Sequence, residues 1–578
     1  MRWWRRGVER DSPGRLIFQS GRSRIRCLIK RRIISGIILV LALEPAWLAG
    51  ARAADAPGFV DLRRAPDAVR VVTETATNEL RLAGGKWRSD DMEVTTRRER
   101  NGLAVELQAP TRAVKRVELR WPTAAAPGWR FLGDAWERAY GDLEWKERDG
   151  ARVMPWYFLA SDGVVAHGFG VKTGAGTLCY WTVDSSNIIL HADARCGGRG
   201  VLLGRRELKV CTVVCRAGRS GETPFAAARA FCQMMCPDPV LPQHPVYGFN
   251  DWYCSYGHDT ADGFLTNVAY LTSLIPAGGN RPFAVVDDGW QAEGKRHEQR
   301  GAWNEVRPSF SKSLTMPGFA REIEALGAQP GLWCRPLIAN DDAPAGWRLA
   351  RDRNFLDPTV PEVRRHIRQL MARFAGWGYR LIKHDYTTDD LLGRWGFEMG
   401  SQITPDGWAF ADRSRTTAEV IRDLYEDIRE GAGRRALILG CNTMGHLSAG
   451  LFEMQRIGDD TSGREWSRTR KMGVNCLAFR APQDGAFFAV DADCAGQSTR
   501  DSVPWEKNSQ WLDLLARSGT VVFVSFPREA VGPEREGALR AALIAASRRQ
   551  PLGEPEDWFD SRTPSRWLLD GKEADYAW

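Results

Sequence analysis

Between residues 246 and 494 the chain repeats one pattern, in which a short apolar run ends in polar and often acidic residues. Carboxylates end at least four different runs. Like charges repel and lose hydration when they gather, so a purely structural protein has little reason to bring them together. The residues that close the runs are therefore the candidates for chemistry: Asn250, Asp251, Trp252, Asp287, Asp288, Trp290, Arg335, Lys383, Asp385, Asn442, Arg456, Asp459, Asp460, Asp491 and Asp493.

Acidic residues without accompanying histidine or cysteine clusters favour glycoside hydrolysis, which uses a pair of carboxyl groups across the scissile bond. A Mg²⁺ or Ca²⁺ site is the alternative, because both ions prefer oxygen ligands. The neighbours of these acids are cationic and aromatic, which argues against a metal site. Any one of these acids, taken singly, is more often a solvated strand end or a helix cap, so the prediction depends on the whole set.

The tripeptide Lys383-His384-Asp385 places two opposite charges on one face of a strand, because side chains alternate along a strand. The Lys383 charge favours the ionised form of Asp385, which suits a nucleophile. Arg456 lies three residues before Asp459 and is expected to hold an acid or a sugar hydroxyl there.

The runs that position these residues alternate with helical stretches, which predicts an α/β fold of the (β/α)₈ TIM-barrel type. Active sites of such barrels lie at the C-terminal ends of the strands, where these polar residues fall. A doubly wound sheet is the structural alternative. The strand-like runs are VYGFNDW, PFAVVDDGW, QPGLWCRPL, YRLIKHDY, ALILGCN, FEMQRIGDD, VNCLAFR and FFAVDADC, with helices such as PGFAREIEALGA, PEVRRHIRQLMARFAGWG and RTTAEVIRDLYEDIREGA between them.

Short alternating apolar segments with Gly, Pro and Asp between them predict an N-terminal antiparallel β-sandwich domain over residues 55–235. Its segments include VRVVTET, VKRVELRW, TLCYWTV and ELKVCTVVC. PFAAARAFCQMMC predicts a helix, and PDPVLPQHP predicts a joint before a catalytic barrel at 240–525. Residues 526–578 are expected to form a small C-terminal β segment.

Residues 1–53 have the features of a signal peptide, with a basic stretch, the apolar run IISGIILVLALEPAWLAG and ARA before Ala54. We expect export to a periplasm or out of the cell, and no membrane association after cleavage. A retained anchor is the alternative, but the run contains Glu44 and Pro45 and is short for a bilayer span. Residues 1–53 hold twelve Lys or Arg and three Asp or Glu, so of the total charge of +8 the remaining chain carries −1 and has no basic surplus for nucleic acid.

Tryptophan and cysteine are informative in different ways. The 24 tryptophans fit either carbohydrate binding, in which indole faces stack on sugars, or a large β-rich core. Eleven of the twelve cysteines follow the signal, an odd number that argues against a complete disulfide framework. The pairs Cys211/Cys215 and Cys232/Cys236 are spaced more widely than usual zinc hooks, so we expect buried thiols or one disulfide and no metal.

Three motifs in this order, PFAVVDDGW, YRLIKHDY and RIGDDTSG, resemble those of the clan of α-galactosidases in glycoside hydrolase families 27 and 36. An N-terminal β domain before the barrel resembles family 36 more than family 27. GLWCRPL is similar to the third-strand motif of that family, and FLDPTVPEVRRHI to the stretch that leads to its fourth strand. The resemblance covers about residues 240–530.

The resemblance implies a role for each matching residue. Asp385 corresponds to the nucleophile, which forms a covalent glycosyl-enzyme, and Asp459 to the general acid/base. Asp287 and Asp288 correspond to acids that bind sugar hydroxyls, as Lys383 does, while Trp290 and Trp252 fit a stacking wall. The full set of expected substrate-binding residues is Trp252, Asp287, Asp288, Trp290, Arg335, Lys383, Asn442, Arg456 and Asp460.

The expected activity is hydrolysis of terminal α-linked galactose by double displacement, with a carbohydrate as the binding partner and without a cofactor. Asp460 is the alternative acid/base because it adjoins Asp459, and its charge would raise the pKa of that neighbour. The prediction requires Asp385 to meet Asp459 or Asp460 across one cavity.

Two departures from the resemblance leave the substrate open. Arg335-Pro336 stands where family 36 has Glu-Pro, and CNTMGH after the fifth run matches neither family. An α-N-acetylgalactosaminidase, a β-L-arabinopyranosidase and a transglycosylase of the same clan are therefore alternatives. A non-catalytic sugar-binding barrel is the alternative from another class. The sequence does not indicate an oligomeric state.

Overall fold

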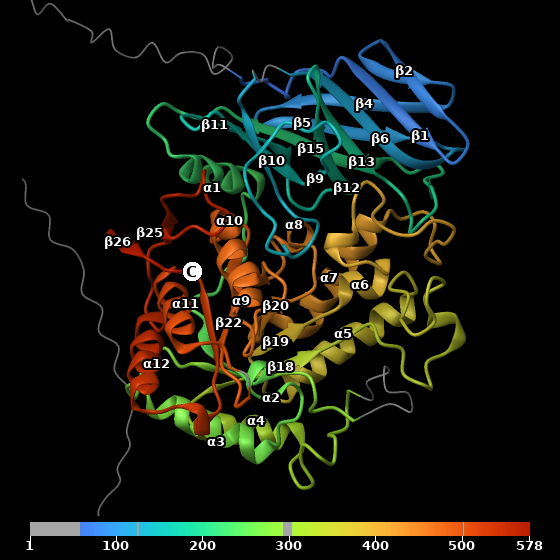
Figure 1. Cartoon of the computed structure of the whole chain (residues 1–578). Helices are drawn as coiled ribbons and strands as arrows, with labels where there is room; N and C mark the ends of the chain where they lie inside the picture. Colours follow the sequence, from blue (N-terminus) through green and yellow to red (C-terminus); the bar gives the residue numbers. More distant parts are fainter. Residues whose placement is uncertain (1–57, 124–126, 293–302, 501) are drawn as a thin grey trace, which may run out of the picture. The chain divides into compact units, whose positions relative to one another are not determined.

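The computed structural model describes residues 58–123, 127–292, 303–500 and 502–578. Within these ranges the chain forms an N-terminal β domain, a closed parallel barrel and a short C-terminal sheet (Figure 1). The predicted signal peptide, residues 1–53, lies outside the described residues. Every helix in the described ranges is too short or too polar to span a lipid bilayer.

The N-terminal domain is the predicted antiparallel β-sandwich. Its strands are β1 (Ala68–Thr73), β2 (Thr77–Ala83), β3 (Lys86–Ser89), β4 (Met92–Glu99), β5 (Gly102–Gln108), β6 (Ala113–Pro122), β7 (Arg130–Gly133), β8 (Lys146–Glu147), β9 (Met154–Pro155), β10 (Tyr157–Ser161), β11 (Ala166–Val171), β12 (Leu178–Val183), β13 (Asn187–Asp193), β14 (Val201–Leu202) and β15 (Leu208–Arg216). The two layers join at β2, which pairs with β1 on one side and β3 on the other. Trp181 of β12 packs on Phe158 of β10, with ring centroids 5.8 Å apart, so both layers contribute to one core.

Eight parallel strands close into the predicted barrel. They are β16 (Tyr247–Asn250), β17 (Phe283–Val286), β18 (Gln329–Cys334), β19 (Leu381–His384), β20 (Leu437–Gly440), β21 (Met454–Arg456), β22 (Ala489–Gly496) and β23 (Val521–Ser525). Pairing of β16 with β23 completes the ring. Strands such as β17, with the sequence FAVV, are buried at every position, which is why they are continuous apolar runs in the sequence.

Helices connect the barrel strands and cover them. They are α2 (Trp252–Ser255), α3 (Ala261–Ser273), α4 (Met316–Ala325), α5 (Pro361–Gly376), α6 (Thr387–Leu392), α7 (Thr417–Ala432), α8 (Gly445–Ser448), α9 (Trp466–Thr469), α10 (Cys476–Arg480), α11 (Trp505–Arg517) and α12 (Pro533–Ala546). The three predicted helical stretches are confirmed as α4, α5 and α7. Thr416 and Glu419 form a capping box at the start of α7, which fixes where that helix begins.

The prediction of one strand was wrong. The apolar run VNCLAFR, residues 474–480, lies in a helical segment that includes α10, and it is not a barrel strand. The eighth strand is instead β23, with the sequence VVFVS. A short apolar run that is buried on all sides has the same composition in a helix as in a strand, so periodicity cannot separate the two.

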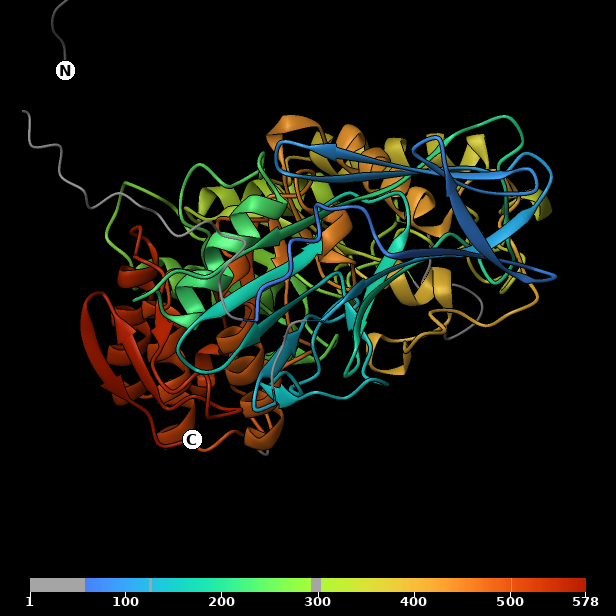
Figure 2. The ribbon, with the colours of Figure 1, turned by 90° about the horizontal axis from the view of Figure 1, so that it is seen from above.

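The C-terminal region contains both a helix and a sheet. Strands β24 (Glu554–Pro555), β25 (Arg566–Leu569) and β26 (Lys572–Asp575) form an antiparallel sheet, drawn in red near the C-terminus in Figure 2. Helix α12 precedes them, packs on α11 and contacts β16 and β23. The stretch 526–578 therefore begins with a helix that covers the barrel, in addition to the predicted β segment.

The cysteines of the described residues are free thiols, and all but Cys254 are buried. Cys211 and Cys215 lie on strand β15, and Cys232 lies on helix α1 (Pro224–Met235), in the elements predicted for CTVVC and FCQMMC. Within the described ranges, no group of three or more His, Cys, Asp or Glu side chains is arranged to hold a metal ion.

Candidate active site

The predicted site residues lie at or shortly after the C-terminal ends of the barrel strands, except Asp491 and Asp493, which lie within β22. Asn250 ends β16, Lys383 lies near the end of β19, and Arg456 ends β21. Asp287 and Asp385 come directly after β17 and β19. Because the strands are parallel and close into a barrel, these ends open into one mouth.

An ion pair between Lys383 and Asp287 forms part of this mouth. Lys383 Nζ lies 2.7 Å from Asp287 Oδ2, and both side chains are buried. Asn250 Nδ2 donates to the same oxygen at 2.6 Å, and the Asp287 N–H donates to Asp251 Oδ1 at 2.7 Å. Desolvation raises the pKa of Asp287, and the Lys383 charge opposes that shift. The pair offers a donor and an acceptor side by side, which suits neighbouring sugar hydroxyls.

Asp385 is partly exposed, and both of its carboxylate oxygens accept hydrogen bonds. The Tyr386 N–H donates to Oδ1 at 2.8 Å, and the Trp333 indole N–H donates to Oδ2 at 3.3 Å. The Asp385 N–H donates to the Cys334 carbonyl of β18 at 3.0 Å. Tyr386 has a φ of 63°, a left-handed conformation that is uncommon for non-glycine residues and that clusters at active sites. These contacts hold the carboxylate in one orientation.

Asp459 and Asp460 follow β21 and differ in how their carboxylates are bound. Asp459 pairs through Oδ1 with Arg138 at 3.1 Å and through Oδ2 with Arg468 at 2.7 Å. Asp460 uses Oδ1 for both of its ion pairs, with Arg456 at 2.9 Å and with Arg138 at 3.6 Å. The Asp460 side chain is 38% exposed and that of Asp459 is 18% exposed. Asp460 therefore has the more accessible carboxylate.

The charges of Asp460 and Asp385 both affect the side chain of Tyr386. Desolvation raises the pKa of the Tyr386 phenol most, and the charges of Asp385 and Asp460 both raise it further. Desolvation also raises the pKa of Asp460, but the charges that include Arg456 and Lys383 outweigh it and hold this pKa below its ordinary value. The structure thus brings Asp385, Asp460 and Lys383 into one electrostatic environment.

A loop of the N-terminal domain completes the mouth, although no strand-end pattern in the sequence indicated it. The Ala139 N–H donates to the Ile457 carbonyl at 2.8 Å, and the Asp459 N–H donates to the Ala139 carbonyl at 2.9 Å. This short ladder carries Arg138, whose side chain is 4% exposed, to the two acids that follow β21. Arg138 is therefore a site residue contributed by the other domain.

The neighbouring Glu137 fastens the same loop to the barrel. Its carboxylate accepts hydrogen bonds from the Asn442 amide, the Tyr140 hydroxyl and, at 2.9 Å, the Gly396 N–H. Desolvation raises the pKa of Glu137 to about 7. Asn442, predicted to bind substrate, is fully buried, and its Oδ1 accepts the Asp389 N–H at 3.0 Å. Its contacts join the two domains.

The two tryptophans predicted to form a stacking wall are placed differently. Trp290 is fully buried, and its indole N–H donates to the Trp333 carbonyl at 3.0 Å. Trp303 packs against it, with the two ring centroids 5.9 Å apart. Protein therefore covers Trp290, and it cannot present a face to a sugar. Trp252 is partly exposed after β16 and remains a candidate for stacking. Asp288, also predicted here, accepts the Gln291 amide at 2.7 Å.

Arg335, which stands where the resemblance has an acid, is occupied by protein groups. Its guanidinium donates to both oxygens of Asp390, with the shortest contact at 2.6 Å, and lies 4.0 Å from the centre of the Tyr386 ring. Desolvation raises the pKa of Asp390 to about 7, against the opposing effect of Arg335. Arg335 thus compensates the negative charge of the buried Asp390 and packs on Tyr386, the residue that follows Asp385.

Substitution Arg335→Met should destabilise the fold by about 3–5 kcal/mol at pH 8, because it leaves Asp390 buried without its cation. Loss of Arg335 raises the pKa of Asp390 above about 7. When burial raises the pKa of an acid, the folded protein loses stability as the pH rises above the pKa that this acid has in the unfolded chain. The difference in stability between variant and wild type should therefore shrink at pH 5, where Asp390 is protonated in both folded proteins. Thermal unfolding midpoints at the two pH values measure this.

The double variant Arg335→Met/Asp390→Leu is the control, because replacing a whole buried ion pair with apolar groups costs much less than removing one partner. An equal loss of stability at pH 5 and pH 8, or no loss in the single variant, would contradict a buried ion pair at this position.

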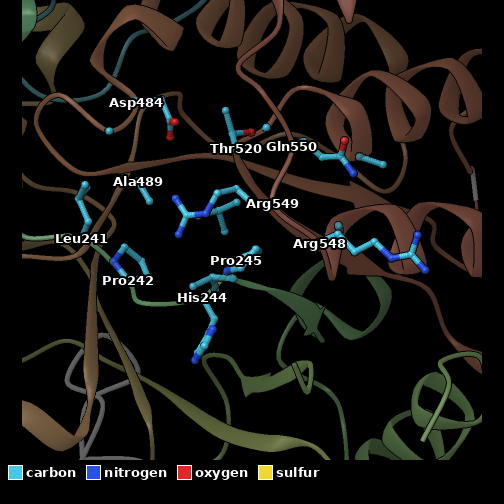
Figure 3. Close-up of a pocket in the computed structure, with 16 residues that line it drawn as sticks. Leu241, Pro242, His244, Pro245, Asp484, Ala489, Thr520, Arg548, Arg549 and Gln550 are labelled. Carbon is cyan, nitrogen blue, oxygen red and sulfur yellow. The ribbon is translucent and has the colours of Figure 1, made fainter. Parts of the chain in front are cut away.

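A cavity of about 100 Å³ lies at the other end of the barrel strands (Figure 3). Its lining includes Ala489 and Val521, which begin β22 and β23, together with Pro242 and Pro245 of the predicted joint. A second cavity of about 820 Å³ shares this joint and includes Phe283 at the start of β17. Neither cavity is lined by a predicted site residue.

The sequence matches no protein-family model. The structure is similar to that of TtGalA, an α-galactosidase from Thermus thermophilus solved with p-nitrophenyl α-D-galactopyranoside, at 18% identity and a TM-score of 0.56 over 88% of this chain and 99% of that one. The GH36 α-galactosidase AgaA from Geobacillus stearothermophilus matches at 13% identity and a TM-score of 0.56, over 84% of this chain and 75% of that one. An α-galactosidase from Lactobacillus brevis matches at 13% identity and a TM-score of 0.54, over 85% and 69%. The predicted resemblance is thus confirmed at the level of structure: this chain has the fold of the GH36 α-galactosidases.

Proposed function

We propose that the chain is a retaining glycoside hydrolase that removes terminal α-linked galactose from oligo- or polysaccharides. One observation carries the proposal: an oriented carboxylate, Asp385, and an accessible one, Asp460, share a barrel mouth with the Lys383–Asp287 pair. A nucleophile and an acid/base on a common cavity are what a retaining glycosidase needs. The fold shared with α-galactosidases supports galactose as the sugar.

The first chemical step forms a galactosyl ester. An oxygen of Asp385 attacks the anomeric carbon, the bond to the leaving-group oxygen breaks, and Asp460 gives its proton to that oxygen. In the second step Asp460 takes a proton from water, and the water oxygen displaces Asp385 from the anomeric carbon. Two inversions give α-galactose, so the configuration is retained.

Asp460, which we assign as acid/base in preference to Asp459, has to be protonated when the glycosidic bond breaks. In the free protein its pKa is held low, because the charges of Arg456 and Lys383 outweigh desolvation. A sugar that fills the mouth excludes the water around Asp460 and strengthens desolvation, which raises this pKa. Asp459 is less suited because Arg138 and Arg468 occupy both of its oxygens.

The remaining groups bind and orient the sugar. Lys383 and Asp287 contact neighbouring hydroxyls as donor and acceptor, and Trp252 stacks on the apolar face of the ring. Hydrogen bonds from Tyr386 and Trp333 keep Asp385 aimed at the anomeric carbon. The reaction needs no cofactor. We further propose that the protein acts after export, on carbohydrate in a periplasm or outside the cell.

A panel of aryl glycosides tests this proposal, with the product anomer followed by NMR from the start of the reaction. We expect turnover of the α-galactoside with α-galactose as the first product, and much slower turnover of the α-N-acetylgalactosaminide and the β-L-arabinopyranoside. The same protein with Asp385→Asn, prepared in parallel, controls for contaminating activity.

Each other outcome of the panel has a definite meaning. Release of β-galactose first would exclude a retaining mechanism. Preference for either of the other two glycosides would move the assignment to a different sugar within the same mechanism. Binding of galactose without turnover of any glycoside would identify a non-catalytic sugar-binding barrel.

A further inference from the structure

Phe397 is an exposed aromatic residue next to the proposed active site. It lies in the 3₁₀ turn Gly396–Glu398, after α6, and its side chain is 63% exposed. It contacts Tyr140 of the N-terminal domain edge to face, with ring centroids 4.9 Å apart. Two aromatic rings from different domains therefore meet at the surface. Single exposed apolar residues are common on proteins, but a group of them indicates a binding site.

Two pairs of contacting rings, which the segment 395–397 connects, lead from this surface toward the catalytic acids. Trp395 lies beneath the Arg138 guanidinium at 5.3 Å, and Arg138 in turn pairs with Asp460. Trp395 also contacts Tyr386 at 5.6 Å, and Tyr386 follows Asp385 directly. The four rings, Tyr386, Trp395, Tyr140 and Phe397, are called the aromatic shelf below. The shelf begins beside both acids and ends in solvent at Phe397.

Hydrogen bonds hold the shelf in place before any ligand arrives. The Glu137 carboxylate accepts from both the Tyr140 hydroxyl and the Gly396 N–H, so one acid fixes both sides of the shelf. Glu398 accepts the Trp395 N–H at 2.9 Å and closes the turn. A side chain at Gly396 would come within 2.7 Å of Glu137, which shows how closely the two segments approach. A binding surface that is ordered in advance loses little entropy when a ligand binds.

We propose that the aromatic shelf binds the sugar on the leaving-group side of the scissile bond. The inference depends on the proposed function, because the leaving group is the part of the substrate next to the acid/base, Asp460. Trp395 reaches that acid through Arg138. Flat aromatic faces stack on the apolar C–H face of a neutral pyranose. The ligand is thus an uncharged sugar ring that carries the α-galactosyl group, or an acceptor sugar that attacks the galactosyl ester.

Two substrates with the same galactosyl group separate this site from the galactose site. Raffinose places sucrose, with its glucose and fructose rings, on the leaving-group side, whereas α-galactosyl fluoride has only a fluorine atom there. We expect Phe397→Ala to lower kcat/KM for raffinose about three- to tenfold, mainly through KM, because one stacking contact is lost. It should leave kcat/KM for the fluoride unchanged, as measured by fluoride release. Phe397→Trp, which keeps an aromatic face, should hydrolyse raffinose with a kcat/KM near that of the wild type.

Leu82→Ala is the matched control, since Leu82 is 56% exposed on β2 and lies outside the shelf. It should change neither substrate's kcat/KM. The shelf is refuted as a sugar site if Phe397→Ala leaves raffinose hydrolysis unchanged, or if it lowers both substrates equally, which indicates a structural role. If the unaltered protein hydrolyses neither substrate, the proposed function itself is wrong.

Discussion

Substitution of Asp385 by alanine should lower kcat/KM for an aryl α-galactoside by on the order of 10⁵-fold, because the group that forms the covalent intermediate is lost. The loss should appear with α-galactosyl fluoride as well, since even the best leaving group needs a nucleophile on the opposite face. The fold should be retained, because Asp385 is partly exposed and its partners are one indole and one backbone N–H.

Added azide should restore turnover of the Asp385→Ala variant. Azide fits the space of the missing carboxylate and attacks the anomeric carbon from the same face, so the product should be β-galactosyl azide, identified by NMR. Hydrolysis at the wild-type rate without azide would show that Asp385 is not the nucleophile. Rescue that yields α-galactosyl azide would assign Asp385 to the acid/base role instead.

Asp460→Ala and Asp459→Ala form a matched pair of adjacent carboxylates, and the first should have much the larger effect. Loss of the acid/base should lower kcat/KM for raffinose by about 10²–10⁴-fold. For α-galactosyl fluoride kcat/KM should stay near the wild-type value, because fluoride leaves without a proton. Asp459→Ala should lose far less on raffinose, since Asp459 has both oxygens engaged by Arg138 and Arg468.

Azide gives an independent readout for the same pair. In the Asp460→Ala variant azide attacks the galactosyl ester from the face where Asp460 stood and needs no base, so α-galactosyl azide should accumulate. This product has the opposite configuration to that expected from Asp385→Ala. If instead Asp459→Ala shows the selective loss on raffinose and the α-azide, then Asp459 is the acid/base and our assignment of Asp460 is wrong.

The barrel and most of its mouth were predictable because both follow from local pattern. Asp287 and Asp385 end apolar runs. The parallel strands of a barrel bring such ends together at one face, independent of the length and sequence of the loops. The choice between VNCLAFR and VVFVS as a strand was not predictable, because both runs are short, apolar and buried. Tertiary packing alone decides such cases.

The individual roles of side chains were harder to predict than their location. Trp290 and Trp252 both follow barrel strands, yet Trp290 is fully buried and Trp252 is partly exposed. Arg335 and Asn442 occupy predicted positions, but their partners are protein groups. Arg138 had no signal at all, because it lies in a loop more than 300 residues before Asp459 and no periodicity connects the two. Roles of this kind depend on distant partners, which a single sequence does not reveal.

The Arg138 ladder has a consequence for how this protein can evolve and be engineered. Residues 138–139 supply a cation and two backbone hydrogen bonds to the segment after β21. Each of the two segments therefore has to match the other, although they belong to different domains. A barrel grafted onto the β domain of a relative would keep its carboxylates but lose the cation between them, unless this loop were exchanged too. Such chimeras should therefore work only when residues 134–140 and 456–468 are inherited from the same parent.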